Sequence, residues 1–473
     1  MDYRLEQDSI GEGKVPKEAY YGIHTKRGMD NFPITGQKLH VELVRALAIV
    51  KKACALANYE AGLLEEEVKD AIVKACDEIE DGKMMDEFIT DPIQGGAGTT
   101  ANMNANEVIA NRANEIMGGK KGCYEYVHPN DHVNMGQSTN DVFPTSGKIA
   151  AVNIMERTVY ELELLYDALM EKAVEFDHIL KMGRTQLQDA VPIRLGQEFH
   201  AYASVVKRDI ERMKRSKYKL RFINMGATAI GTGINVDPTY FKRIVPILKD
   251  LTGIDLVRSE DLIDGTNNVD NLVEVSGNLK TAAISLSKMA SDFRLLSSGP
   301  KTMVADIKLP AKQAGSSIMP GKVNPVIPEV MNQVAYRVIG NDMTVTICGE
   351  SGQLELNAFE PVLFYSLFES LEILANGVYT LRENCVKGIE ANQKILDKDI
   401  RESVGIVTAL VPHLGYTTTS KIAKESLEKD RPVRELIIEY NLMSEEMLDE
   451  ILDPKAMTQP GIAAEYLIKQ RNK

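Results

Sequence analysis

The chain lacks the features that mark membrane and secreted proteins. It has no uninterrupted apolar run that approaches the roughly 18 residues of a membrane span. Its first residues, MDYRLEQDSIGEGK, carry acidic side chains where a signal peptide would have an apolar core. Cysteine is scarce, and the five residues are widely spaced and never arranged as C-x-x-C: Cys54, Cys76, Cys123, Cys348 and Cys385. Because reduced thiols fit this pattern, we expect a cytoplasmic protein with no membrane contact.

Basic residues do not outnumber acidic ones. Lys and Arg number 55 against 68 Asp and Glu, which gives a net charge of -13. Proteins that bind nucleic acids or anionic membranes usually carry basic patches, so we expect neither kind of partner. A small anionic substrate is still compatible with this net charge if a few cationic side chains lie at its binding site.

Several well-known site motifs are missing from the glycine-rich loops. In "GSSIMPGKVNP", residues 315–325, five residues separate Gly315 from Gly321 and Val323 follows Lys322, so the loop is no phosphate-binding P-loop. The G-x-S-x-G and S-x-x-K spacings of serine enzymes do not occur there either. The loops at 94–108 and 226–235 lack the G-x-G-x-x-G of a dinucleotide site. Taken singly, each of these loops is most simply interpreted as a tight turn.

A metal site is weakly indicated at one place only. His128 and His132 are four residues apart in "HPNDHVNMGQSTND", residues 128–141, a spacing that can bind zinc on a helix. Pro129, Asn130 and Asp131 favour a turn or a helix start instead, and no third ligand is evident. We therefore expect no metal ligands here.

Long helices dominate what the sequence does contain. Apolar residues recur three or four apart over residues 151–180, which predicts one long amphipathic helix. Similar patterns cover 190–220, 267–297, 326–346 and 353–390, and Pro361 predicts a kink in the last. Helices of this length need neighbours along the whole apolar stripe, so we expect a mainly α fold built on a helix bundle that can form the core of an oligomer.

The pattern along the chain predicts three regions. Residues 1–140 form a mixed, mostly helical region, with helices near 41–60 and 64–82 followed by glycine-rich and asparagine-rich loops. Residues 141–394 contain the long helices, and residues 395–473 carry shorter helical patterns. We interpret these as an N-terminal domain, a central bundle domain and a small C-terminal domain.

Polar loops next to long helices are the candidate sites. They lie at 94–108, 128–141, 183–192 and 315–325, and they supply hydroxyl and amide groups together with Lys322. If each loop is taken alone, helix capping explains its polar residues, for example Ser138 to Asn140 or Thr185 with Gln186. Taken together, hydroxyls, amides and one lysine suit the recognition of carboxylates better than phosphate chemistry or acyl transfer.

These loops resemble the signatures of a known family. GSSIMPGKVNP is similar to the signature loop of the fumarase/aspartase superfamily, and the similarity continues through GAGTTANMNANEV, HPNDHVNMGQSTNDVFPT, GRTQLQDAVP and RLLSSGP. Within the superfamily, "TDPIQGGAGTT" and "KMGRTQLQDAVP" resemble the aspartate ammonia-lyase branch more than class II fumarase. The resemblance covers nearly the whole chain. It implies a three-domain fold, a central domain of five long helices, and a homotetramer whose twenty helices form the core.

The resemblance also implies a reaction and its residues. The reaction is the reversible deamination of L-aspartate to fumarate, by removal of a C3 proton through an aci-carboxylate, with active sites shared by three subunits. Ser316 would be the base, and Asn140 would contact the amino group. One substrate carboxylate would be held by Thr99, Ser138, Thr139 and Ser317, and the other by Thr185, Lys322 and Asn324. No cofactor is implied as necessary, and activation by Mg2+ is left open.

Gln186 separates the two main alternatives. It lies where fumarases usually have His, whose expected partner would be Glu329. A hydratase must protonate hydroxide as it leaves, whereas an α-ammonium leaves as neutral ammonia, so Gln at this position favours deamination. The alternatives are a class II fumarase, which hydrates fumarate to L-malate, and a non-catalytic structural protein on the same scaffold, like the lens proteins of the superfamily. Retention of Thr99, Ser316, Lys322 and Asn324 weighs against the structural protein.

Overall fold

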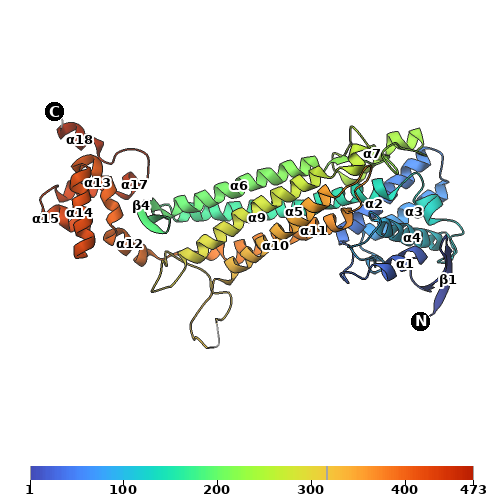
Figure 1. Cartoon of the computed structure of the whole chain (residues 1–473), viewed down its shortest axis with the longest axis horizontal. Helices are drawn as coiled ribbons and strands as arrows, with labels where there is room; N and C mark the ends of the chain where they lie inside the picture. Colours follow the sequence, from blue (N-terminus) through green and yellow to red (C-terminus); the bar gives the residue numbers. More distant parts are fainter. Residues whose placement is uncertain (1, 316–317, 472–473) are drawn as a thin grey trace. The chain divides into compact units, whose positions relative to one another are not determined.

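The computed structural model describes residues 2–315 and 318–471 and is mostly helical. The chain divides into two compact units, each assembled from three stretches. The first unit comprises Met1–Tyr160, Asp209–Ala283 and Val334–Asn376, and the second comprises Glu161–Arg208, Ile284–Gln333 and Gly377–Lys473. Five long helices contribute residues to both units: α5 (Thr139–Glu175), α6 (Leu195–Lys219), α9 (Asp270–Leu296), α10 (Val326–Glu350) and α11 (Glu360–Asn384) (Figure 1).

The first unit adds shorter helices and two small sheets to its share of the long helices. The helices are α1 (Ile23–Asn31), α2 (Val41–Glu60), α3 (Glu66–Glu80), α4 (Thr99–Ile116), α7 (Pro238–Thr252) and α8 (Asp264–Asn267). Strands β1 (Tyr3–Asp8) and β2 (Gly11–Pro16) pair antiparallel, and β5 (Phe222–Ile223) pairs parallel with β6 (Val257–Arg258). Helix α2 packs against α3, α4 and α7 and buries Leu47 and Val50 completely, so it forms the centre of this part.

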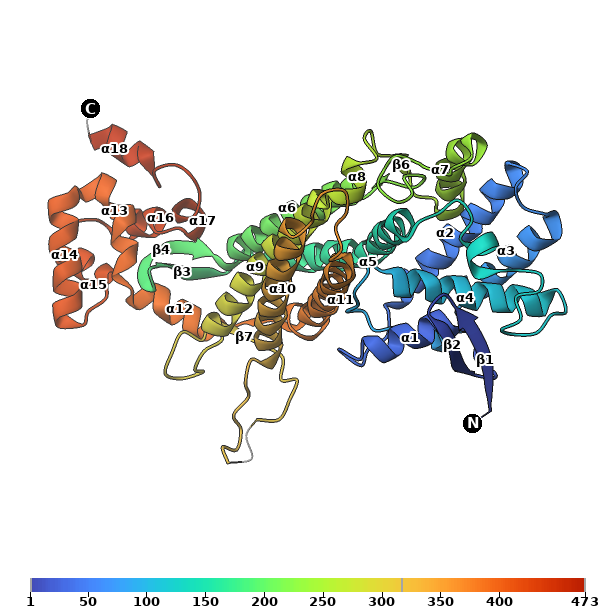
Figure 2. The same cartoon turned by 45° about the vertical axis from the view of Figure 1, so that its right-hand side comes forward.

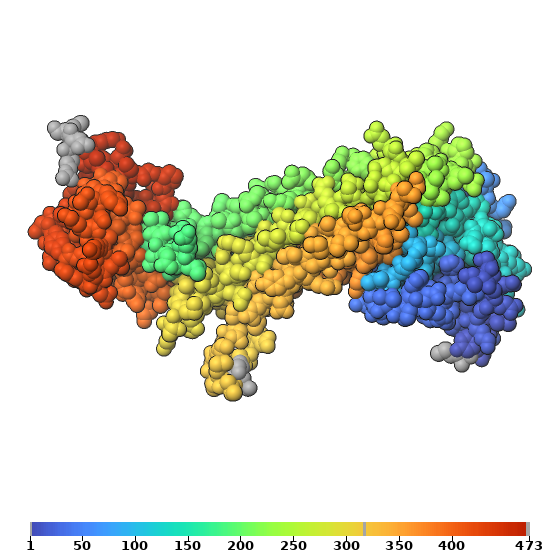
Figure 3. Space-filling view, in the orientation of Figure 1, coloured from blue at the N-terminus to red at the C-terminus, as the bar shows by residue number. Residues whose placement is uncertain are grey.

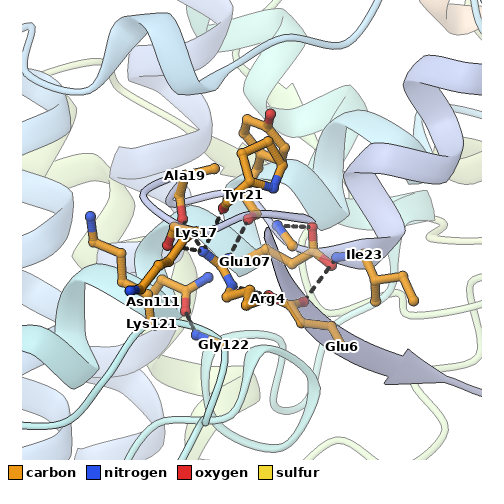
Figure 4. A network of polar contacts seen from close by, with 12 residues as sticks. Arg4, Glu6, Lys17, Ala19, Tyr21, Ile23, Glu107, Asn111, Lys121 and Gly122 are labelled. Carbon is orange, nitrogen blue, oxygen red and sulfur yellow. Dashed lines mark hydrogen bonds and ion pairs between the residues drawn. The ribbon is translucent and has the colours of Figure 1, made fainter. Parts of the chain in front are cut away.

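Polar contacts fasten the N-terminal strands and α1 to α4. The carboxylate of Glu107 in α4 accepts hydrogen bonds from the backbone N–H groups of Gly22, His24 and Thr25 and from the Thr25 hydroxyl. Glu6 of β1 accepts from the N–H of Ile23 at 2.9 Å (Figure 4). These contacts satisfy the first N–H groups of α1, which has no side-chain cap of its own.

The second unit adds a hairpin and a C-terminal group of short helices. Strands β3 (Leu180–Thr185) and β4 (Gln188–Arg194) form an antiparallel hairpin that leads into α6, with α12 beside β3 (Figure 2). A second small sheet pairs β7 (Ile307–Lys308) with β8 (Glu390–Ala391). The C-terminal helices are α12 (Gln393–Glu402), α13 (Val407–Leu414), α14 (Tyr416–Lys429), α15 (Val433–Glu439), α16 (Glu445–Ile451), α17 (Pro454–Met457) and α18 (Glu465–Arg471). Helices α13, α14, α15, α16 and α18 contribute to a small hydrophobic core that includes Leu410, Leu436 and Leu448.

The long helices contact one another within each unit. In the first unit, Ser276 of α9 donates a hydrogen bond to Asp342 of α10 at 2.8 Å. In the second unit, Tyr202 of α6 donates to Asp292 of α9 at 2.9 Å, and Phe199 stacks on Phe293. Part of the described chain between α9 and α10 projects at the surface of the second unit (Figure 3).

The predicted long helices are confirmed as helices, and some of their boundaries are corrected. Each of the five predicted segments contains a helix, although α5 begins earlier, at Thr139, and β4 occupies the first residues predicted for α6. The kink predicted at Pro361 is wrong. Helix α11 begins at Glu360, so Pro361 lies in the first turn, where a helix needs no backbone N–H from that residue. The three-domain division at 140 and 395 partitions the chain differently from the two units and stays a prediction.

Candidate active site

The first unit brings together the starts of α4 and α5. Thr99 is the first residue of α4 and follows Gly98, whose φ is +89°. A Cβ at Gly98 would lie 2.5 Å from the ring of Phe143 in the first turns of α5, so only glycine allows this approach. Thr139 begins α5. Two of the predicted substrate-binding loops, at 94–108 and 128–141, therefore meet in this unit.

Hydrogen bonds to the backbone orient the turn that carries Ser138, Thr139 and Asn140. The hydroxyl of Ser138 accepts from the N–H of Asn140 at 3.2 Å, which is the helix cap considered from the sequence. The amide nitrogen of Asn140 donates to the carbonyl of Ala229 at 2.7 Å. Asn224 in turn donates to the carbonyl of Asn140 at 2.9 Å. The loop at 226–235 thus contacts the candidate site, although its own sequence carries no recognised motif.

Asp141 ties these two loops together. Its carboxylate is fully buried and accepts from the N–H of Ser138 at 3.0 Å and from those of Gly226 and Thr228, each at 3.1 Å. Burial raises the pKa of Asp141 to about 6, although the three backbone donors act in the opposite direction. Sequence analysis did not single out Asp141, and an acidic residue directly after Ser-Thr-Asn was the available signal.

A buried lysine holds the segment that precedes this turn. The ammonium of Lys51 in α2 donates to the side-chain oxygens of Asn134 at 2.9 Å and Gln137 at 2.8 Å. Burial lowers the pKa of Lys51 to about 8. Asn102 and Asn106 of α4 also donate to the Asn134 oxygen, each at 3.2 Å. Two asparagines of the ANMNANE stretch, Asn102 and Asn106, therefore hold the loop that precedes Ser138.

The two histidines of the 128–141 loop have structural roles. His128 caps the short π-helical turn Pro129–Val133 by accepting from the N–H groups of Asn130 and Asp131. The Nδ1 atom of His132 accepts from the N–H of His128 at 2.9 Å. Over residues 2–315 and 318–471, no group of three or more His, Cys, Asp or Glu side chains is placed to hold a metal ion.

The second unit carries the other predicted residues. Thr185 ends β3, and Gln186 follows it at the exposed tip of the β3–β4 hairpin rather than at a helix start. Lys322 and Asn324 line a hollow of about 630 Å³ with Arg294, Ser297 and Ser298 of the RLLSSGP stretch. Arg294 of this stretch also faces Glu329, with 4.0 Å between the charged groups.

Backbone geometry closes the 315–325 loop on itself. A Cβ at Gly315 would lie only 1.6 Å from the carbonyl oxygen of Lys322, so this crossing requires glycine. Gly321 has a φ of +81°, which also favours glycine. The predicted base Ser316 and the predicted carboxylate donor Ser317 lie outside the described residues.

The predicted residues are thus distributed over the two units. Thr99, Ser138, Thr139 and Asn140 belong to the first, and Thr185, Gln186, Lys322 and Asn324 belong to the second. Among the helices formed by residues 2–315 and 318–471, none combines the length and the hydropathy of a membrane-spanning helix.

Comparisons with known proteins identify the family. A family model described as "Lyase" matches residues 11–340, and one described as "Fumarase C C-terminus" matches residues 406–459. The chain is 53% identical to aspartate ammonia-lyase of Bacillus subtilis over 469 residues, which is 99% of each chain. A fumarate lyase:delta crystallin structure from Brucella melitensis, bound to cobalt, has a TM-score of 0.95 at 48% identity and covers 97% of this chain and 100% of its own. Class II fumarase from Schistosoma mansoni reaches a TM-score of 0.93 at 34% identity, with the same coverage. The chain therefore belongs to the aspartate ammonia-lyase family of the fumarase/aspartase superfamily.

Proposed function

We propose that the chain catalyses the reversible deamination of L-aspartate to fumarate and ammonia. The observation that carries the proposal is the identity to aspartate ammonia-lyases over nearly the whole length. The donor set of the candidate residues supports it, because hydroxyls, amides and one lysine are suited to a substrate with two carboxylates.

The reaction requires strong stabilisation of a developing charge. Removal of the C3 proton leaves an aci-carboxylate dianion, and donors that grip this dianion more tightly than the substrate lower the barrier. Thr99, Ser138, Thr139 and Ser317 hold the carboxylate at which this charge develops. Thr185, Lys322 and Asn324 hold the other carboxylate, with Lys322 as the cation.

Ser316 acts as the base that takes the C3 proton. A serine hydroxyl is a poor base unless its alkoxide is stabilised, and GSSIMPGKVNP contains no histidine that could assist it. The backbone N–H groups of the loop and the charge of Lys322 are the available stabilising groups. Glycines at 315 and 321 allow the loop to close over the substrate.

Asn140 contacts the substrate ammonium group. Its amide nitrogen is committed to the carbonyl of Ala229. Its side-chain oxygen accepts no hydrogen bond from the described part of the chain, and an amide oxygen is an acceptor for an ammonium N–H. The hydrogen bond to Ala229 supports this role because it fixes which end of the amide faces outward.

Deamination is favoured over hydration by Gln186. The shared fold does not separate the two reactions, because a class II fumarase has the same fold. Glutamine has no titratable proton to give to a leaving hydroxide, whereas ammonia leaves neutral without one. The proposed reaction uses side chains of the protein alone, and activation by Mg2+ stays a prediction.

The active form is a homotetramer in the cytoplasm, with sites shared by three subunits. Helix α10 carries large apolar side chains that are exposed in the single chain, including Tyr336 at 63%, Met343 at 62% and Ile347 at 56% exposure. They recur at helical spacing, so they form one stripe that association would bury. The exposed hairpin tip at Gln186 also supports a site completed by other subunits. All five cysteines are free, which is compatible with a reducing compartment.

A direct assay tests the proposal. The purified protein is supplied with L-aspartate or with L-malate, and formation of fumarate is followed by its absorbance. We expect turnover of aspartate and no comparable turnover of malate. Equal rates would make the protein a fumarase, and no turnover of either would favour a structural role.

A further inference from the structure

A buried group of charged residues lies behind the tip of the β3–β4 hairpin. Asp306 is fully buried, and its Oδ2 atom accepts from Arg184 at 2.8 Å and pairs with Lys181 at 3.1 Å. Lys181 also pairs with Glu198 at 2.9 Å, and Arg184 reaches Asp399 at 3.4 Å. We call these five residues, Lys181, Arg184, Glu198, Asp306 and Asp399, the hairpin clamp.

The hairpin clamp joins four segments of the second unit. Lys181 and Arg184 lie on β3, Glu198 on α6 and Asp399 on α12, while Asp306 directly precedes β7. Figure 2 shows β3 and α12 next to each other, in agreement with their contacts. The clamp therefore fixes the hairpin to the chain that runs toward the 315–325 loop.

Asp306 is the fixed point of this group. Its backbone carbonyl accepts from the N–H of Asn392 at 2.9 Å, and the Asn392 side chain donates to the carbonyl of Ala305 at 2.9 Å. The pairing of β7 with β8 follows immediately. Ala305, Ile307 and Asn392 line the same hollow as Lys322 and Asn324. Asn392 and the pairing of β7 with β8 thus hold Asp306, which lies in the same connection between α9 and α10 as Lys322 and Asn324.

Arg184 is held from several sides. One terminal nitrogen of its guanidinium donates to Asp306, the other donates to Asp399, and its Nε lies 3.6 Å from Asp189. The rigid planar fork of a guanidinium fits such an arrangement, whereas a lysine ammonium would not reproduce it. A buried ion pair is weak evidence for stability, since replacing it by apolar residues is often neutral. A role in geometry explains this cluster better.

The residues next to Arg184 form a strained turn that the surrounding contacts must hold in place. Gln186 and Leu187 form the two-residue turn of the hairpin with φ values of +54° and +63°. Turns with two positive φ values favour Asn-Gly, so Gln-Leu is strained here. A strained turn persists where its surroundings fix it, and such turns cluster at functional sites.

We propose that the hairpin clamp is a positioning device for the substrate: Arg184, held by Asp306, fixes the hairpin tip and with it Thr185 and Gln186. The role assigned to Thr185 and Gln186 rests on the proposed function. The mechanical part, that the clamp holds the hairpin tip, stands on the contacts alone. Arg184 and Asp306 act through their neighbours and do not touch substrate.

The mechanical part is tested with a fluorescent reporter. The chain contains no tryptophan, so Leu187→Trp at the 70% exposed tip gives a single-tryptophan protein. We expect lower tryptophan anisotropy when Arg184→Lys or Asp306→Asn is added. Arg194→Lys is the matched control, because Arg194 ends the same hairpin and pairs with Asp177 at 2.7 Å away from the tip. Unchanged anisotropy in Arg184→Lys, which keeps the charge, overturns the clamp even where Asp306→Asn does not fold.

The functional part is tested by kinetics without the reporter. In Arg184→Lys we expect KM for aspartate and the inhibition constant of succinate, a non-reacting dicarboxylate, to rise together by about 10- to 100-fold, because a misplaced donor weakens both complexes. Arg194→Lys should leave both constants unchanged. A lowered melting temperature with unchanged KM would show a purely structural role and overturn the proposal. Absence of aspartate turnover in the unsubstituted protein would refute the proposed function, while the anisotropy result would still decide whether the clamp holds the hairpin.

Discussion

The candidate site residues differ in how firmly the protein holds them. Asn140 is oriented by its hydrogen bond to Ala229, and Ser138 is held by the carboxylate of Asp141 through its backbone N–H. Lys322, in contrast, is exposed at the edge of a large hollow, in a loop that closes at Gly315. Exposed side chains contribute little to stability, so the contribution of Lys322 should appear in kinetics rather than in stability.

Lys322→Ala should weaken the grip on one substrate carboxylate. A hydrogen bond to a charged group contributes about 1.5 to 3 kcal/mol, so kcat/KM for aspartate should fall roughly 10- to 150-fold, mainly through KM. Steady-state kinetics across aspartate concentrations would measure this. Lys308→Ala is the control, because the exposed Lys308 lines the same hollow and has no assigned role. Equal effects of the two substitutions would remove Lys322 from the site.

Ser316→Ala should abolish proton removal while leaving binding intact. The hydroxyls and amides proposed to hold the carboxylates are unchanged in this variant, so it should bind succinate with little change. Exchange of the C3 hydrogen of aspartate in heavy water should fall by about 10²- to 10⁴-fold, the range typical of losing a general base. NMR detects this exchange directly. Normal succinate binding with exchange at the original rate would mean that another residue is the base.

Some helices bury ionisable side chains, and the stability of the fold then depends on pH. Glu360 begins α11 and is fully buried, and burial raises the pKa of its carboxyl to about 8, while Lys148 of α5 acts in the opposite direction. The ammonium of Lys148 itself donates to the carbonyl of Phe222 at 2.8 Å, and burial lowers the pKa of Lys148. A helix start that buries an acid in this way is more stable when the acid is protonated.

Glu360→Gln should make stability less dependent on pH. The unfolded carboxyl titrates near 4.5, so between about pH 5 and pH 8 the folded protein binds a proton that the unfolded chain has lost. The free energy of unfolding of the original protein should therefore decrease as pH rises through this window, by about 1.4 kcal/mol for each pKa unit that separates the two states. Glutamine removes this term, so the variant should gain relative stability at pH 8 compared with pH 5.5.

Urea unfolding followed by circular dichroism at these two pH values would measure the difference. Glu355→Gln is the control, because Glu355 is exposed and lies just before α11. If the Glu360 and Glu355 variants show the same pH dependence, the carboxyl of Glu360 is not protonated in the folded protein at neutral pH.

At the scale of the whole molecule, the candidate residues come from loops far apart in the sequence. Thr139 begins α5 in the first unit, and Ser316 follows α9 by a long connection. The exposed apolar stripe on α10 supports association of several chains. Under the proposed function each active site takes Ser316 and Thr139 from different subunits.

Hybrid tetramers test this sharing of sites. Chains carrying Ser316→Ala and chains carrying Thr139→Ala should each be nearly inactive alone. When they are unfolded together and reassembled, some sites should combine an intact Ser316 from one chain with an intact Thr139 from another, and activity should return. Reassembly of each variant by itself is the control. Hybrids that contain both chains and stay inactive would show that both residues act from the same subunit.

The amino-acid sequence by itself predicted which segments form long helices, which family the chain resembles and which residues are candidates for the site. Apolar residues at helical spacing predicted the long helices because that pattern is local, and five loop motifs in order indicated the superfamily, which the comparisons confirmed. The assignment of Thr99, Lys322 and the other site residues stays a prediction.

Only the tertiary structure decided which polar residues support the site. Lys51 reaches Asn134 across 83 residues of sequence, and Arg184 reaches Asp306 across 122. Neither partner is encoded in a local pattern, because a hydrogen bond between distant segments exists only once the packing of the helices brings them together. The same holds for Pro361, whose place in the first turn of α11 depends on where the helix begins. Local spacing predicted the long helices of this protein, and the fold decided where they begin and which buried charges hold them in place.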